Sequence, residues 1–282
     1  MKKQFRRGLT VLLALGLLTG GSMTIYQQLQ YKKSRDIYNE ARDIAAVSSP
    51  SEQEAEVPAD TEPEPTSEPA AAEGSDAAPL PAPPPDSYAQ ALNDMDLDSL
   101  QAVNADVLGW IEIPGTDLSY PLVQGTDNQY YLEHTWKKDP SAAGSIFLEC
   151  QCSPDLSDFN TIVYGHRMRN GSMFGSLKYF NDVSYWNEHP AIYLRDASGT
   201  RRYMIFAAYE ADIRSFTYRL KITKNEDKQT LIDFALSNSV IHTGITPTVD
   251  ESILTLSTCT GNGHASRWVV QAVLTDHFRL GS

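Results

Sequence analysis

Cysteine is scarce in this chain: only three of its 282 residues are cysteine. So small and odd a number excludes a domain held together mainly by disulfide bonds. Basic residues are also in deficit, with 23 Lys and Arg against 36 Asp and Glu and a formal net charge of −13. A basic nucleic-acid-binding face is therefore not expected, and nucleic acid is not predicted as a partner.

Lysine and arginine are absent altogether from residues 48–98, which carry 13 acidic residues and 10 of the 16 prolines. Such a stretch cannot bury enough apolar surface to offset its chain entropy. Proline and like-charge repulsion keep it extended. The stretch is therefore predicted to be a disordered stalk.

The N-terminus combines a basic start with an apolar run. Four basic residues lie within residues 1–8, and residues 9–26 are uncharged and mostly apolar. A helix of that length spans about 28 Å, close to the core of a bilayer. The pattern predicts a membrane anchor with a cytoplasmic N-terminus, although Lys32, Lys33 and Arg35 weaken the argument for orientation. A cleaved signal peptide has the same opening and stays an alternative, as does a buried helix.

These patterns divide the chain into four segments. Residues 1–8 are expected to be a cytoplasmic basic tail, and residues 9–26 a transmembrane signal-anchor. Residues 27–98 are expected to be an extracellular juxtamembrane segment and Pro/Glu-rich stalk. Residues 99–282 are expected to be the folded domain, with its start near residues 97–103; about 180 residues suit one domain.

The folded part is predicted to be mainly β. Eight runs rich in Ile, Val, Tyr and Thr are bounded by turn-forming residues, as is typical of strands. The runs are residues 107–113, 119–123, 145–149, 160–164, 191–195, 202–209, 253–259 and 268–274. Helical patterns are fewer, at residues 89–105, 173–180 and 225–237. Many short strands with few helices favour a barrel or a sandwich.

Two of the three cysteines form a Cys-x-Cys pair, Cys150 and Cys152. Two thiols are too few for a structural zinc site, which needs four ligands. The pair is expected to be structural or incidental, with a redox-labile pair or a metal site as the alternatives.

The third cysteine, Cys259, ends a predicted strand and precedes a small polar loop, a position at which nucleophiles are often mounted. A cysteine nucleophile needs a proton acceptor or a cation nearby. His264 is close in sequence, and His166 ends another predicted strand. Arg267 opens the last strand and could stabilise an oxyanion, or could be an ordinary surface charge.

Several blocks together resemble one family. Thr255-Leu-Ser-Thr-Cys259, followed eight residues later by Arg267, resembles the signature of sortases. The run from Val163 to Gly175, which contains Tyr-Gly-His166-Arg, resembles the histidine block of class B sortases. Residues 107–115 and 120–131 also resemble class B, as does the long segment from Tyr218 to about residue 246. The resemblance covers roughly residues 100–276.

The resemblance implies a closed eight-stranded β-barrel with flanking helices, and a catalytic trio of His166, Cys259 and Arg267. This chain order argues against papain-like peptidases, in which the cysteine comes first. It also leaves His264 as a loop residue. The candidate substrate-binding residues are Ser257, Thr258, Thr260 and Tyr218. Strand alternation places at most one of the two β-strand neighbours, Ser257, on the face of Cys259.

The implied activity is that of a membrane-anchored cysteine transpeptidase on a Gram-positive-type cell surface. It would cleave a sorting signal after Thr in an exported protein and form a thioester on Cys259. The acyl group would then pass to an amine of a cell-wall precursor or of a pilin. No cofactor or metal is expected. The alternatives are a cysteine peptidase that only hydrolyses and a membrane-tethered binding module without catalysis.

Overall fold

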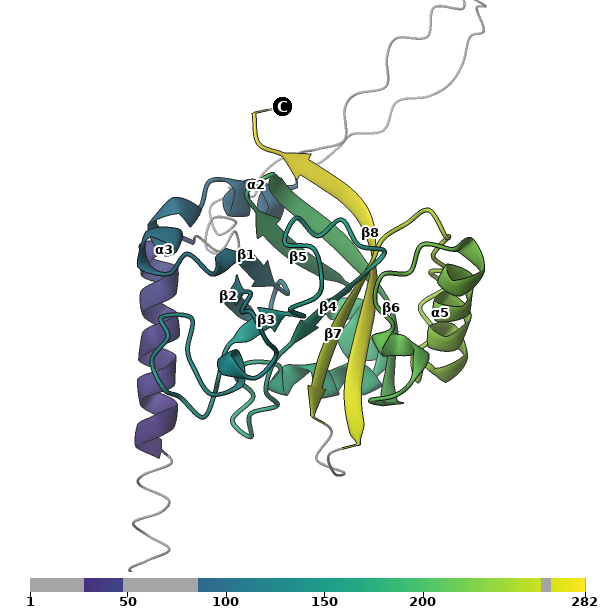
Figure 1. The fold of residues 1–282 in the computed structure, drawn as a ribbon, viewed down its shortest axis with the longest axis horizontal. Coiled ribbons are helices and arrows are strands. Elements are labelled where there is room, and N and C mark those ends of the chain that lie inside the picture. The colour runs from purple at the N-terminus through teal and green to yellow at the C-terminus, as the bar shows by residue number, and fades with distance from the viewer. Residues whose placement is uncertain (1–27, 48–85, 260–264, 282) are drawn as a thin grey trace, which may run out of the picture.

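The computed structural model describes residues 28–47, 86–259 and 265–281, with the position but not the side chain of Cys259. Its main body is a closed barrel of eight strands in the order β1-β2-β3-β4-β7-β8-β6-β5 (Figure 1). The strands are β1 (Val107–Glu112), β2 (Ser119–Val123), β3 (Ile146–Leu148), β4 (Asn160–Tyr164), β5 (Ala191–Asp196), β6 (Gly199–Asp212), β7 (Ile253–Cys259) and β8 (Ser266–Arg279). All eight strands that the sequence predicts are present, so the closed eight-stranded barrel is confirmed.

Two strand pairs are parallel, β2 with β3 and β4 with β7, and the other six pairs are antiparallel. A parallel pair needs a long crossover connection, because its strands run in the same direction. Here the connection from β4 to β7 contains β5, β6 and the helix α5 (Asn225–Asn238). The parallel pairing brings the C-terminal ends of β4 and β7 to the same edge of the barrel.

Two hydrophobic clusters bury the strands, and at β7 they lie on opposite faces of the sheet. The larger cluster fills the barrel and includes Leu254 and Leu256 of β7. The smaller cluster lies between the outside of the barrel and α5, where Ile253 of β7 packs with Leu231 and Ile232. Because strand residues alternate between faces, odd-numbered positions of β7 face α5 and its neighbours, and even-numbered positions face the barrel interior.

The helices differ from the expected ones mainly near the N-terminal side of the barrel. The single helix expected over residues 89–105 is two helices, α2 (Ser87–Asn93) and α3 (Leu97–Val103). Each begins at an aspartate whose carboxylate accepts a backbone N–H, Asp86 from Ala89 and Asp96 from Ser99. The second cap starts a new helix, because an N-cap residue adopts a non-helical conformation. The remaining short elements are η2 (Tyr130–Leu132), η3 (Gly175–Asn181), α4 (Val183–Glu188) and η4 (Phe216–Tyr218).

A further helix, at residues 28–44, lies along one side of the barrel (purple in Figure 1). Tyr38 and Ala41 on one of its faces are buried, as is Ala45 in the turn that follows it. The Tyr38 hydroxyl donates to the Gly144 carbonyl at 2.5 Å. Packing against the barrel therefore begins within the segment 27–98 and before the domain boundary expected at residue 99.

The predicted stalk and anchor fall mostly outside this structure. Residues 48–85 of the stalk and the apolar run at 9–26 lie outside the described residues. Residues 86–98, also expected to be disordered, instead form α2 and the start of α3 and bury Ala89 and Leu92. Within residues 28–47, 86–259 and 265–281, no helix is long and apolar enough to cross a bilayer.

The packing of the helix at residues 28–44 can be tested by Tyr38→Ala. We expect it to lower the free energy of unfolding by about 3–5 kcal/mol, the usual cost of removing a buried aromatic side chain. Leu29→Ala is the matched control, because Leu29 is on the same helix and 60% exposed; its effect should stay within about 0.5 kcal/mol. Urea unfolding of the full chain measures both. An effect of Tyr38→Ala as small as that expected for Leu29→Ala would show that the helix does not contribute to the stability of the folded barrel.

Candidate active site

The three residues of the predicted trio meet at one edge of the barrel. Tyr164 at the end of β4 pairs with Ser257 of β7, and the Gly165 N–H donates to the Ser257 carbonyl at 3.3 Å. His166 follows directly. On the other side of β7, Cys259 pairs with Arg267 at the start of β8. The strand order β4-β7-β8 thus places these three positions next to one another, at the lower edge in Figure 1.

His166 is half-buried, and its Nε2 lies 2.7 Å from the carbonyl oxygen of Leu132, the last residue of η2. A carbonyl oxygen can only accept, so Nε2 must carry a proton in this arrangement. Exchange of a proton with any other group then takes place at Nδ1. The Leu132 carbonyl therefore fixes both the orientation and the tautomer of the imidazole.

The turn that carries this carbonyl is itself tightly held. Tyr131 is buried, and its hydroxyl donates to Asp106 at 2.7 Å and accepts from Asn104 at 3.0 Å. Gly144 packs against the turn with φ of +56°, and a Cβ there would lie 2.6 Å from the Leu132 oxygen. Only glycine combines this backbone conformation with so close an approach.

Gly144→Ala is therefore expected to displace the Leu132 carbonyl and to release His166. In the unchanged protein, the Nε2 of His166 should give an ¹⁵N resonance typical of a protonated ring nitrogen. In the variant, the two ring nitrogens should shift toward an averaged tautomer mixture. Gly244→Ala is the matched control, because Gly244 also has positive φ, +75°, but has nothing within 4 Å of an added Cβ. Unchanged ¹⁵N shifts in Gly144→Ala would contradict the proposed role of the carbonyl.

The four candidate substrate-binding residues are separated by the structure. Ser257 is buried on the outer face, and its hydroxyl lies 2.9 Å from the hydroxyl of Tyr218 in η4. Thr258 is also buried, but alternation turns it toward the barrel interior, where its Oγ1 has no hydrogen-bond partner among the described residues. Its side chain is therefore not placed to contact a substrate on the face of Ser257. Thr260 lies outside the described residues.

A buried polar network holds η4 against the strands of the site. Asn160 of β4 donates to the carbonyls of Thr217 and Arg219 at 2.9 and 3.1 Å. Its side-chain oxygen accepts from Thr255, which accepts from Gln271 of β8 at 2.8 Å. Buried polar groups that are fully bonded make an arrangement specific. The network thus fixes Tyr218, the residue between the two Asn160-bound carbonyls, over β7.

A buried carboxylate, Glu149, lies beside the end of β4. Its oxygens accept from the Asn128 amide at 2.6 Å and from the Tyr164 hydroxyl at 3.1 Å. Burial and this carboxylate raise the pKa of Tyr164, which therefore stays a hydrogen-bond donor. The sequence does not predict these contacts, because Asn128, Glu149 and Tyr164 come from separate parts of the chain.

The thiols of Cys150 and Cys152 are unsuited to nucleophilic chemistry. Burial and the neighbouring Glu149 carboxylate raise the pKa of Cys150, and burial raises the pKa of Cys152 to about 11. Both are therefore protonated near neutral pH, whereas the thiolate is the reactive form. Among the described residues, no group of three or more His, Cys, Asp or Glu side chains is placed to hold a metal ion.

Comparison with known proteins identifies the family of the chain. The family model for the sortase domain matches residues 111–275, which include β4, the histidine block, β7 and most of β8. The chain belongs to the sortase family. This finding agrees with the family that the sequence blocks indicate.

The relatives are sortases of class B. Sortase B of Listeria monocytogenes is 33% identical over 164 residues, 58% of this chain and 67% of the relative. Sortase B of Staphylococcus aureus is 32% identical over 162 residues, 57% of this chain and 66% of the relative. The matched part of this sortase thus corresponds to about two thirds of each relative's length.

Solved structures give the same result for the fold. A Staphylococcus aureus sortase B–substrate complex superposes with a TM-score of 0.61 at 30% identity, covering 66% of this chain and 85% of that one. Clostridium perfringens sortase B superposes with a TM-score of 0.60 at 32% identity, covering 64% of this chain and all of that one. The predicted class B sortase, a cysteine transpeptidase, is confirmed.

Proposed function

We propose that this sortase cleaves a sorting signal after its threonine in exported proteins and transfers the acyl part to an amine. The observation that carries the proposal is the register at the barrel edge. Cys259 lies directly opposite Arg267, and the adjacent strand β4 leads into His166. A nucleophile, a proton-transfer group and a cation at one site are what acyl transfer through a thioester requires.

In the first step, the thiolate of Cys259 attacks the carbonyl carbon of the threonine. The C–S bond forms and the carbonyl oxygen becomes negatively charged. Arg267 is the group assigned to stabilise this charge, together with the backbone N–H after Cys259. The intermediate then collapses, the C–N bond breaks, and His166 delivers its Nδ1 proton to the leaving amine.

In the second step, an amine attacks the thioester and His166 takes up a proton at Nδ1. The C–N bond of the product forms, the C–S bond breaks, and Cys259 leaves as the thiolate. The Leu132 carbonyl keeps the Nε2 proton in place in both steps, so that a single nitrogen gives and receives the proton. The amine is proposed to belong to a cell-wall precursor or to a pilin.

Ser257 and Tyr218 are proposed to line the substrate groove. Their hydroxyls are bonded to each other on the face of β7 that also bears position 259. One of the solved structures that this chain resembles is a sortase B–substrate complex, which supports a peptide signal as the substrate class. Ser257 is itself buried, so the partly exposed Tyr218 that it holds is the hydroxyl proposed to contact the peptide.

The proposed location is the outer surface of the cell membrane, with a single anchor at residues 9–26. The basic residues at positions 1–8 support a cytoplasmic N-terminus, and the Pro/Glu-rich residues 48–85 would connect the helix at residues 28–44 to α2, two elements that both bury side chains in the folded domain. The helix at residues 28–44 would then lie between the anchor and the stalk while packing on the catalytic barrel.

Incubation of the full chain in detergent with a sorting peptide, with and without an amine acceptor such as triglycine, tests the proposal. We expect slow cleavage with the peptide alone and formation of the amide-linked product when the acceptor is added. Cleavage to the acid alone, even with abundant acceptor, would indicate a peptidase. Binding without cleavage would indicate a non-catalytic module.

A further inference from the structure

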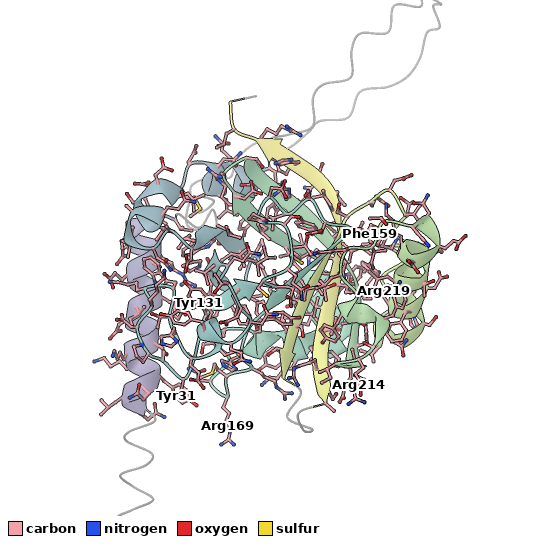
Figure 2. The ribbon with its side chains drawn as sticks, viewed as in Figure 1. Tyr31, Tyr131, Phe159, Arg169, Arg214 and Arg219 are labelled. Carbon is pink, nitrogen blue, oxygen red and sulfur yellow. The ribbon has the colours of Figure 1, made fainter. Side chains whose placement is uncertain are left out.

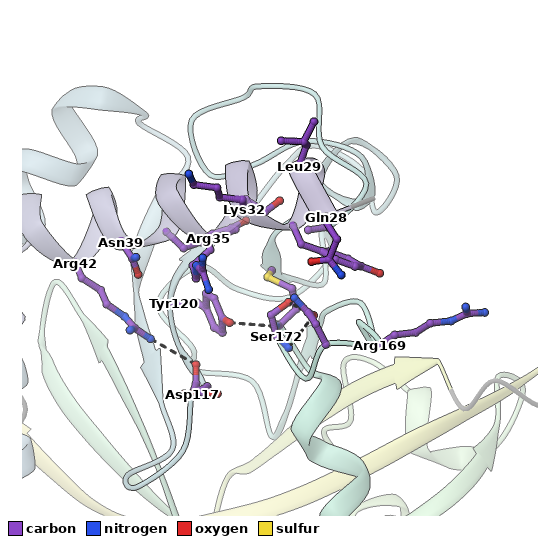
Figure 3. A pocket seen from close by; sticks show the side chains of 16 residues that line it. Gln28, Leu29, Lys32, Arg35, Asn39, Arg42, Asp117, Tyr120, Arg169 and Ser172 are labelled. Atoms are coloured by element: carbon purple, nitrogen blue, oxygen red, sulfur yellow. Dashed lines mark hydrogen bonds between the residues drawn. The ribbon is translucent and has the colours of Figure 1, made fainter. Parts of the chain in front are cut away.

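A groove separate from the trio lies between the helix at residues 28–44 and the loop that follows His166 (Figure 3). Its volume is about 990 Å³. The helix contributes Lys32, Arg35 and Arg42, and the loop contributes Arg169. Tyr31 and Arg169 both reach the lower edge of the molecule in Figure 2, the edge at which β7 ends in Figure 1.

The charge of this groove is opposite to that of the chain. Its lining holds four basic side chains and one acidic one, Asp117, in a protein with a net charge of −13. No carboxylate of the described residues lies within ion-pair distance of Lys32, Arg35, Arg42 or Arg169. Positive side chains without nearby counter-charges attract an anion. Lys32 and Arg35 are one helical turn apart, whereas Arg169 points away from the helix in Figure 3.

The arginine nearest the barrel is already oriented. Arg42 donates from one terminal nitrogen to the backbone carbonyls of Asp117 and Ser119, at 3.4 and 3.2 Å. Its Nε is buried and has no partner among the described residues. Backbone carbonyls do not neutralise its charge, but the Glu112 carboxylate on β1 lies close enough that, although burial raises the pKa of that carboxyl, Arg42 acts to lower it. Lys32 and Arg35 therefore supply most of the uncompensated charge of the groove. Arg35 faces the same space above Tyr120 in Figure 3.

The floor of the groove is less polar than its rim. Tyr120 and Met173 are buried there, and the Met173 N–H donates to the Tyr120 hydroxyl at 3.0 Å. Guanidinium groups suit phosphate, whose oxygens accept paired N–H donors, and lysine adds a mobile charge at the rim. A tetrahedral anion with a small organic substituent therefore fits the rim and the floor together.

We propose that this groove binds a phosphate group. The group could come from the headgroup of an anionic phospholipid or from free phosphate. Lys32 and Arg35 lie within nine residues of the apolar run at 9–26, at most about 14 Å away along a helix at 1.5 Å per residue. A site so close to the proposed anchor would hold the barrel edge toward the membrane surface. The proposal does not depend on the catalytic roles assigned to the trio.

Calorimetric titration of the full chain in an uncharged detergent tests the site with three probes: inorganic phosphate, glycerophosphoglycerol and glycerophosphocholine. The last two are the deacylated headgroups of phosphatidylglycerol and phosphatidylcholine. We expect the first two to bind and the zwitterionic third to bind least, because its ammonium group is repelled. Tighter binding of glycerophosphoglycerol than of phosphate assigns the source to a lipid headgroup, and the reverse order assigns it to free phosphate.

The variant pair Lys32→Gln/Arg35→Gln should weaken binding about 25-fold. This takes about fivefold for each positive charge removed, the contribution of one Lys or Arg to binding at an anionic lipid surface. Lys221→Gln/Lys224→Gln is the matched control, since it removes the same charge from exposed positions before α5 and should leave binding unchanged. Absence of binding to both anionic probes would overturn the proposal. Equal losses in the two variant pairs, or equally tight binding of glycerophosphocholine, would overturn it as well.

Discussion

Cys259→Ala is expected to abolish both peptide cleavage and transfer, with a residual rate at least about 10⁴-fold below that of the unchanged enzyme. Loss of a nucleophile removes the covalent route altogether, and what remains comes from binding and oxyanion stabilisation. The melting temperature should change little, because Cys259 is the last residue of β7 and the substitution removes one small group at the barrel rim. Single-turnover cleavage of a fluorogenic sorting peptide measures the rate.

The matched control is the double variant Cys150→Ala/Cys152→Ala, which should keep its activity. The raised pKa values of these two thiols also predict the order of chemical modification. A thiol-directed alkylator should label Cys259 first, and prior incubation with sorting peptide should slow that labelling. Peptide mapping in which Cys150 or Cys152 is labelled first, with activity lost in parallel, would overturn the assignment of the nucleophile.

The strands could be predicted from the sequence because their signal is local. β-Branched and aromatic residues mark each run, and turn-forming residues bound it. The two longest strands, β6 and β8, extend beyond the predicted runs by up to five residues at one end. Their extra residues, such as Arg201 and His277, are polar and pair with each other across the strands. Hydrogen bonds to the partner strand keep these residues in the β conformation. The hydrophobic pattern of one strand alone does not reveal that pairing.

The helix at residues 28–44 could not be predicted for a related reason. The buried residues of the helix and of the turn after it are one tyrosine and two alanines, Tyr38, Ala41 and Ala45, among charged neighbours. These residues are too weakly hydrophobic to predict an amphipathic helix, although their spacing of three and four residues suits one. Its partners are distant in sequence: the Trp136 indole donates to the Ile37 carbonyl at 3.2 Å. Tertiary contact supplies the stability that the local sequence lacks.

Some features of the candidate site could also be predicted from the sequence, and others could not. The types and the order of His166, Cys259 and Arg267 are visible in the sequence. Strand alternation predicts opposite faces for Ser257 and Thr258, and the Ser257 hydroxyl lies 2.9 Å from the Tyr218 hydroxyl. The Leu132 carbonyl could not be foreseen, because any residue can present a backbone oxygen. The polar residues Asn160 and Gln271, within otherwise apolar strand runs, were a readable signal. Buried polar groups in strands require partners, which here fix η4 over the site.

His166→Ala is expected to lower the rate of amide cleavage about 10²- to 10⁴-fold, the usual contribution of a positioned acid or base. His134→Ala is the control, and it should retain most of the activity. His134 lies in the turn next to Leu132, stacked on Tyr130 at 4.0 Å between ring centroids, with its Nδ1 2.8 Å from the Tyr130 carbonyl oxygen. His264→Ala should likewise retain most of the activity. Equal losses in His166→Ala and His134→Ala would mean that the turn, and not the imidazole at position 166, supplies the effect.

The leaving group separates the acid role of His166 from a structural one. An amide nitrogen must be protonated as the C–N bond breaks, whereas a nitrophenolate leaves without a proton. In His166→Ala, formation of the acyl-enzyme from a nitrophenyl ester of the sorting peptide should therefore fall much less than formation from the peptide amide. Stopped-flow release of nitrophenol measures the first rate, and single-turnover peptide cleavage measures the second. An identical fold-loss on the ester and the amide would show that His166 acts before the leaving group departs, on the thiol of Cys259, and would contradict proton delivery from Nδ1 as its main contribution.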